Sequence, residues 1–304
     1  MKKRLINSVV IIILIIINSS IYFANISMQQ IGLNVSVQYV SSNPTNDLIA
    51  ILDWKGNLYI TDSSFQELKL IDKNVEDGGN ISHNGQLIAY ISNNILKIVE
   101  IPSLKLIKSK NIADYKIFSI YNMCWSDNDQ SLYLLCRIAN GEVIIQINLL
   151  TMQQTVVIGP EEGWRYQYMA TCPKIKNTLF LIGTLYDEDP VGAPMGIYQY
   201  DLTTKKMSLI NIPKDQDAEL IVNCLAISPD GKMLAYIKPY KIVRYSTIPS
   251  NMIQISTLSG KFLYEIPFTP EDPKKHRDWY TISWPRNDVI YFVCDSNLYK
   301  ILLK

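Results

Sequence analysis

The strongest constraint on the fold is a unit of two apolar strands joined by a short polar turn, which recurs along the chain. The clearest copy is "ISPDGKMLAY" at 227–236. Pro229 sets φ to about −65° for the second position of a turn, Asp230 can bond its own backbone, and Gly231 accepts positive φ. The other copies are "SSNPTNDLIAIL" (41–52), "ISHNGQLIAYI" (81–91), "CWSDNDQSLYLL" (124–135), "CPKIKNTLFLI" (172–182) and "ISWPRNDVIYFV" (282–293).

The spacing of these copies indicates a propeller. Equivalent positions lie 39, 44, 47, 55 and 56 residues apart, and a third apolar strand follows each pair. Most copies add a fourth strand, such as 66–72 or 261–267, so each unit reads as a four-stranded antiparallel meander, or blade. We therefore predict an all-β chain with a six-bladed β-propeller of four-stranded antiparallel blades, about 46 residues each, over residues 31–304. The equivalent positions are Ala50, Ala89, Tyr133, Phe180, Ala235 and Tyr291.

The repeat resembles that of a known family. Ser228-Pro229-Asp230-Gly231-Lys232, an Ala-Tyr strand and a third strand closed by Asp-Leu (201–202) or Thr-Leu (257–258) are similar to the WD40-like repeats of TolB-like six-bladed β-propellers. The resemblance covers about residues 31–304. The motif is complete in one copy, and His83 replaces its proline in a second. The resemblance implies the fold and a family whose members often act in protein contacts, but it transfers no residue role.

The charge balance argues against nucleic acid as a partner. The chain has 29 basic and 28 acidic residues, a net charge of +1, without the concentrated positive field that phosphate backbones require. Hydrophobic residues make up 48% of the chain, and its 19 tyrosines suit half-buried sheets.

The N-terminus predicts a membrane or export segment. Three basic residues at 2–4 precede twenty uncharged residues at 5–24, which we expect to form one apolar helix. Twenty residues can cross about 30 Å of hydrocarbon with the basic end cytoplasmic, whereas a cleaved signal peptide would release the propeller. Both readings make the propeller extracytoplasmic. The predicted parts are a cytoplasmic tail at 1–4, a signal anchor or signal peptide at 5–24, a linker or closing strand at 25–30, and the propeller at 31–304.

The last repeat supplies only three strands before Lys304. An open sheet edge would invite pairing with other chains. We therefore expect part of 27–32 to supply the missing strand or to pack on that edge.

The longest connections are predicted to gather on one face. In a propeller, the loops between strands two and three and those between blades share a face, which we call the long-loop face; the other turns form the short-turn face. Long loops often carry function, and Trp, Tyr and Arg are enriched at interface hot spots. The candidate binding residues on these connections are Trp164, Arg165, Tyr166, Asp187, Asp189, Tyr240, Arg244, Tyr245, His276, Arg277 and Trp279.

No catalytic motif is present in the sequence: it has no G-x-S-x-G, P-loop, G-x-G-x-x-G or H-E-x-x-H pattern. The acidic run 187–189 lacks the spacing and glycine of an EF-hand loop, and the two histidines fall on opposite faces, so we predict no metal and no cofactor. Five cysteines without a CxxC pair are expected to be small buried side chains.

Three functions remain open. The first is a non-enzymatic, membrane-anchored or secreted extracytoplasmic module that binds a protein or an envelope component through the long-loop face. The second is a metal-dependent enzyme of the propeller lactonase or lyase kind. The third is an accessory or sensor subunit of an envelope complex.

Overall fold

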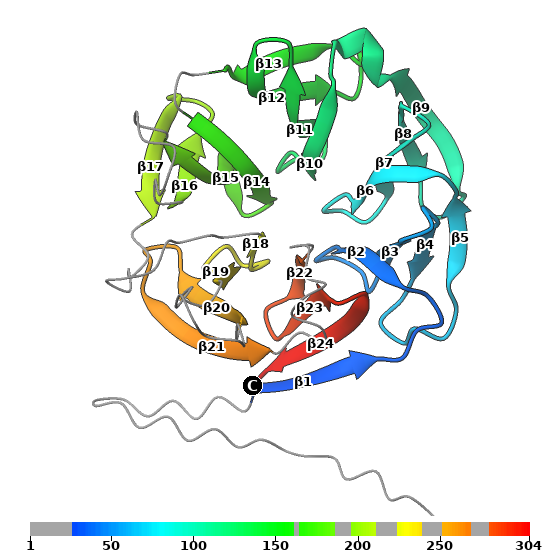
Figure 1. Ribbon diagram of the computed structural model, residues 1–304, viewed down its shortest axis with the longest axis vertical. Coiled ribbons are helices and arrows are strands. Elements are labelled where there is room, and N and C mark those ends of the chain that lie inside the picture. Colours follow the sequence, from blue (N-terminus) through cyan, green and yellow to red (C-terminus); the bar gives the residue numbers. More distant parts are fainter. Residues whose placement is uncertain (1–25, 161–163, 186–195, 211–223, 239–250, 269–279) are drawn as a thin grey trace, which may run out of the picture.

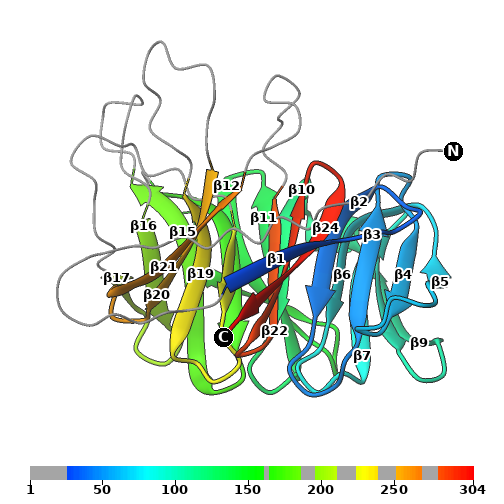
Figure 2. The same cartoon turned by 90° about the horizontal axis from the view of Figure 1, so that it is seen from below.

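The computed structural model describes residues 26–160, 164–185, 196–210, 224–238, 251–268 and 280–304. The apolar helix predicted at 5–24 lies outside these residues. The described chain forms six four-stranded antiparallel sheets arranged around a central axis, as Figure 1 shows from one face and Figure 2 from the side. The predicted six-bladed propeller is thereby confirmed.

The blades follow one another in sequence, with the first strand of each innermost. Blade 1 holds β2 (Val37–Ser42), β3 (Ile49–Asp53), β4 (Leu58–Thr61) and β5 (Lys69–Asp72). Blade 2 holds β6 (Val75–Ile81), β7 (Leu87–Ser92), β8 (Ile95–Glu100) and β9 (Lys105–Asn111), followed by a 3-10 turn η1 (Ile112–Tyr115). Blade 3 holds β10 (Ser119–Trp125), β11 (Ser131–Ile138), β12 (Gly141–Asn148) and β13 (Gln154–Ile158).

The second half of the chain repeats this plan. Blade 4 holds β14 (Trp164–Cys172), β15 (Ile175–Leu185), β16 (Gly196–Asp201) and β17 (Lys206–Ile210). Blade 5 holds β18 (Leu225–Ile227), β19 (Met233–Lys238), β20 (Asn251–Thr257) and β21 (Phe262–Phe268). Blade 6 holds β22 (Thr281–Arg286), β23 (Val289–Cys294), β24 (Asn297–Leu303) and, as its outermost strand, β1 (Ile26–Ile31).

Blade 6 is built from both ends of the described chain. β1 runs antiparallel to β24 from the pair Ile26 and Leu303 to the pair Ile31 and Leu298, and Figure 1 shows the two strands side by side. Leu303 N also donates to the carbonyl of Asp288 in the β22–β23 turn, at 2.9 Å. β1 therefore supplies the fourth strand that the last repeat lacks, and it starts at the short-turn face.

The core lies between the blades. The described residues form six clusters of buried apolar side chains, and each cluster joins the facing sheets of two neighbouring blades. Tyr236, Phe180 and Phe292 are among the largest fully buried side chains. Burying such a side chain contributes about 1.5 to 3 kcal/mol, so the junctions between blades carry most of the stabilisation.

The Ser-Pro-Asp-Gly sequence forms the turn predicted for it. Ser228 Oγ donates to Asp230 Oδ1 at 2.7 Å and accepts from Met233 N at 2.9 Å, and Gly231 has φ +72°. Ser82 and Ser126 make equivalent bonds in blades 2 and 3. The motif therefore positions strands and leaves no group for chemistry.

All five cysteines are free thiols. Four are buried and the fifth, Cys124, is half-buried. The prediction of small buried side chains is thus confirmed for four of them. Burial raises the pKa of the Cys124 thiol to about 12, which makes it a poor nucleophile at neutral pH.

Candidate functional sites

Most of the predicted binding residues lie outside the described residues. Trp164 and Arg165 begin β14, where the structure describes their backbone only. Tyr166 is described in full, and its side chain is 2% exposed in the cluster between blades 3 and 4. Tyr166 therefore belongs to the core and not to an exposed binding surface, because it faces the neighbouring sheet. The predicted residues outside the described ranges are Asp187, Asp189, Tyr240, Arg244, Tyr245, His276, Arg277 and Trp279.

The described part of the long-loop face exposes three aromatic side chains that the sequence reasoning missed. Trp54, in the β3–β4 turn, is 47% exposed; Phe118, between blades 2 and 3, is 70% exposed; and Tyr121, beside the register shift in β10, is 42% exposed. Among the described residues, the other aromatic side chain in this class is Phe262, on the outer strand β21. Three large rings on one face form a surface suited to recognition.

A cavity of about 130 Å³ lies on the axis of the propeller. Its walls come from the inner strands of all six blades and from the short turns that follow them. The described cavity thus lies toward the short-turn face, opposite the predicted binding face. The polar and aromatic side chains that shape it are Tyr39, Asn80, His83, Tyr168, Thr171 and Trp284.

A carboxyl group shielded from water lies on the inner strand of blade 2. Asp77 Oδ1 accepts from Gly78 N at 2.7 Å, while Asp77 Oδ2 is shielded from water and has no hydrogen-bond partner in the described chain. Burial raises the pKa of Asp77 to about 6, and the Gly78 bond only partly opposes this. The Asp77 carboxyl also raises the pKa values of Tyr39 and Tyr168. Asp77 therefore lies within electrostatic reach of both tyrosine hydroxyls at the cavity.

A network of hydrogen bonds joins three blades at the short-turn end of the cavity. His83 Nδ1 lies 3.0 Å from Asp129 Oδ1, and His83 Nε2 lies 3.4 Å from Thr171 Oγ1. Thr171 Oγ1 donates to the carbonyl of Trp125 at 2.6 Å. This network joins blades 2, 3 and 4. Because the Thr171 hydroxyl proton is already donated to a carbonyl, His83 does not activate Thr171 as a nucleophile.

Asp129 is held in its charged form. Burial disfavours the charge, but the hydrogen bond from the His83 ring and those from the backbone amides of His83 and Asn84 outweigh it and lower the pKa of the carboxyl. A lowered pKa means that this contribution to stability is present above pH of about 4 and is lost as the pH falls through the folded-state pKa.

Replacing Asp129 by Asn should reduce the free energy of unfolding at pH 7 by about 1 to 3 kcal/mol, because one of its donors loses an acceptor. Urea denaturation at pH 7 and at a series of values below pH 4 measures this, and the difference between the two proteins should shrink as the pH falls through that range. Asp288→Asn, at an exposed position, is the control. Equal unfolding midpoints for Asp129→Asn and the unmodified protein at pH 7 would contradict the assignment.

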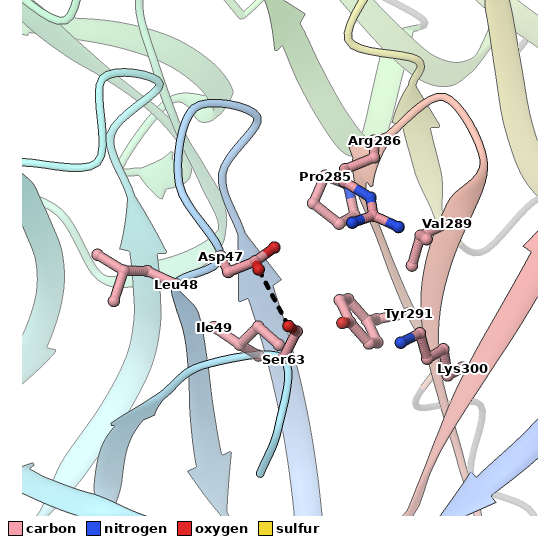
Figure 3. A pocket seen from close by; sticks show the side chains of 9 residues that line it. All are labelled: Asp47, Leu48, Ile49, Ser63, Pro285, Arg286, Val289, Tyr291 and Lys300. Atoms are coloured by element: carbon pink, nitrogen blue, oxygen red, sulfur yellow. Dashed lines mark hydrogen bonds between the residues drawn. The ribbon is translucent and has the colours of Figure 1, made fainter.

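A second, smaller cavity lies in the groove between blades 1 and 6, shown in Figure 3. Its volume is about 10 Å³. Asp47 lines one side, where its Oδ2 accepts from Ser63 Oγ at 3.1 Å, and Arg286, Tyr291 and Lys300 lie on the other. Arg286 binds Asp288 through Nε and Nη2, each at 3.2 Å.

The described residues contain neither a cluster of metal ligands nor a membrane-spanning helix. No group of three or more His, Cys, Asp or Glu side chains lies close enough together there to hold a metal ion. None of the helical segments in that part of the chain has the length and apolar character needed to cross a bilayer.

Comparison with known proteins supports the propeller fold but assigns no family. No family model matches the sequence, and no curated protein matches it. A protein assigned as TolB from Agrobacterium tumefaciens matches over 90% of this chain and 91% of its own, at 12% identity and a TM-score of 0.59. The likeness is one of fold.

Other solved structures show how widely this fold is used. Hydrazine synthase from Kuenenia stuttgartiensis matches over 87% of this chain and 75% of its own, at 13% identity and a TM-score of 0.56. A chain of the mitotic checkpoint complex matches over 91% of this chain and 93% of its own, at 13% identity and a TM-score of 0.53. An enzyme and a member of a protein assembly share the architecture, so the fold alone does not assign a function.

Proposed function

We propose that this chain is a non-enzymatic, membrane-anchored propeller on the extracytoplasmic side, which binds a protein or an envelope component through its long-loop face. The observation that carries the proposal is the set of exposed rings at Trp54, Phe118 and Tyr121 on that face. They extend across blades 1 to 3 the surface that the sequence predicts over blades 4 to 6. Large rings bury much area at little entropic cost, which is why they recur as interface anchors.

The proposal is also supported by the resemblance to TolB-like propellers and by the match to a chain of a protein assembly. The anchor follows from the twenty uncharged residues at 5–24, and a cleaved signal would leave the same propeller secreted. No observation favours the metal-dependent enzyme, since the described residues offer no group of ligands.

Replacing both Phe118 and Tyr121 by Ser should abolish capture of the partner by the full-length chain without changing its unfolding temperature, because both side chains are exposed. Cross-linking in the native envelope, followed by identification of the captured species, measures this. Phe262→Ser, an exposed ring on an outer strand, is the matched control and should capture normally. Capture that is equal in all three proteins would remove the long-loop face as the binding surface.

A further inference from the structure

The groove between blades 1 and 6 contains a cation that has no partner among the described residues. Lys300, on β24, is half-buried, and its ammonium group makes no hydrogen bond or ion pair with any described residue. Other lysines with comparable burial are paired, as Lys97 is with Asp72 at 2.7 Å. A half-buried ammonium left unpaired at a cavity is a candidate for binding an anion.

Further donors converge on the same place. Asp288 holds the Arg286 guanidinium by Nε and Nη2, which leaves Nη1 available, and Figure 3 shows the guanidinium directed toward the cavity. Tyr291 forms the floor with its side chain only 2% exposed, and an edge-on contact with Phe65 at 5.8 Å between ring centroids fixes its ring. Burial, reinforced by the Asp47 charge, raises the pKa of Tyr291 to about 12, so its hydroxyl keeps its proton.

Asp47 restricts the kind of anion that fits. Its carboxylate faces the two cations across the cavity, and no salt bridge joins it to either of them among the described residues. A ligand that touches both sides must accept hydrogen bonds from Lys300, Arg286 and Tyr291 and must donate one to Asp47. Sulfate and carboxylate ions have no proton to donate near neutral pH. Inorganic phosphate keeps at least one proton at this pH, and a phosphomonoester keeps one on a fraction of molecules, since its second pKa is about 6.

The shape of the cavity agrees with this chemistry. The donors approach from a strand, a turn and the floor, which suits a tetrahedral group with several acceptor oxygens better than a flat carboxylate. The cavity, of about 10 Å³, admits about one water-sized group, so it fits a single phosphate oxygen and excludes an aliphatic chain.

We propose that the groove between blades 1 and 6 is a binding site for a protonated phosphate group, held by Lys300, Arg286 and the Tyr291 hydroxyl and selected by Asp47. The phosphate can be inorganic or can belong to a phosphomonoester lipid. The second source is relevant because β1 starts at this turn: Ile26 pairs with Leu303, whose amide binds Asp288.

Isothermal titration of the full-length chain with inorganic phosphate and with sulfate at pH 7 tests the site. The unmodified protein should bind phosphate at one saturable site, about tenfold more tightly than sulfate, and Lys300→Gln should weaken phosphate binding about tenfold or more. Asp47→Asn should bind both anions with similar affinity, because an amide can donate to sulfate. Lys105→Gln, on an exposed strand, is the control and should leave binding unchanged.

Glycine is a zwitterion, so it can also accept from the cations and donate to Asp47. Three results would overturn the proposal: no saturable phosphate binding, equal affinity for sulfate and phosphate in the unmodified protein, or tighter binding of glycine than of phosphate. Unfolding temperatures of all variants establish that each one folds. The full-length chain in vesicles of phosphatidylcholine, with and without phosphatidic acid, separates the two sources. Weaker binding of inorganic phosphate in the vesicles that contain phosphatidic acid would support the lipid, and equal binding in both would support the free ion.

Discussion

Replacing Asp77 by Asn should raise the free energy of unfolding at pH 8 by up to about 3 kcal/mol. The pKa of this carboxyl is about 6 in the folded protein against an ordinary 3.8, and each unit of difference corresponds to about 1.4 kcal/mol. Because the folded state holds the proton more tightly, stability is lost as the pH rises from about 4 to about 6 and stays low above that range. An amide of the same shape carries no such loss.

Urea denaturation between pH 4 and pH 8 measures the effect. The unmodified protein should lose stability over that range, while Asp77→Asn should keep a flat profile through it, and the two should agree near pH 4. Glu67→Gln, at an exposed position, should follow the unmodified protein. Superimposable profiles for Asp77→Asn and the unmodified protein would contradict the assignment of a buried, unpaired Oδ2.

Asp77 also bears on where function lies. A carboxyl that destabilises the protein at neutral pH, when an amide would not, is the kind of group that marks a functional site. It lies within electrostatic reach of Tyr39 and Tyr168, which come from opposite blades. A change in its charge therefore alters the electrostatic potential in the central cavity.

Removing β1 should have the second large effect. A chain that begins at residue 32 should lose on the order of 4 kcal/mol relative to one that begins at residue 26, because six residue pairs with β24 disappear and each backbone hydrogen bond is worth about 1 kcal/mol. The exposed edge of β24 should also promote self-association. Thermal unfolding and sedimentation measure the two effects.

The control for this comparison is Met28→Lys in the longer chain, since that side chain is 39% exposed and its change leaves the backbone pairing in place. Equal unfolding temperatures for the two chain lengths would show that β1 contributes nothing to closure. Unchanged sedimentation would contradict the predicted exposure of an edge.

The sequence predicts the blades well because their signal is local. The turn at 228–231 and its weaker copies fix where first and second strands meet, and apolar alternation fixes their faces. The shortage of one strand in the last repeat is also visible by counting, and it predicts that the segment before residue 32 closes that sheet. These features depend on neighbouring residues, which a single sequence shows.

The candidate sites were harder to predict because their residues meet only after the blades pack. Asp47 and Lys300 lie at opposite ends of the chain and share a groove only through closure between blades 1 and 6. The Asp129 and His83 pair likewise joins turns of different repeats. One signal was available: Gly78 and Gly79, at φ +94° and +90°, directly follow Asp77 and mark an irregular inner strand.

The long-loop face was also predicted in part and missed in part. Connection lengths placed the predicted residues on one face, but they could not distinguish Tyr166, which strand alternation directs into the core, from a solvent-facing neighbour. Phe118 and Trp54 lie in short connections, which loop length does not single out as binding surface.

Because β1 pairs with β24, the order in which the chain is made matters for its quality control. Residues 26–31 are synthesised first, yet their partner, residues 297–303, is synthesised last. The ring therefore stays open until translation is nearly complete, and a chain interrupted before residue 297 presents two unsatisfied strands to proteases and chaperones.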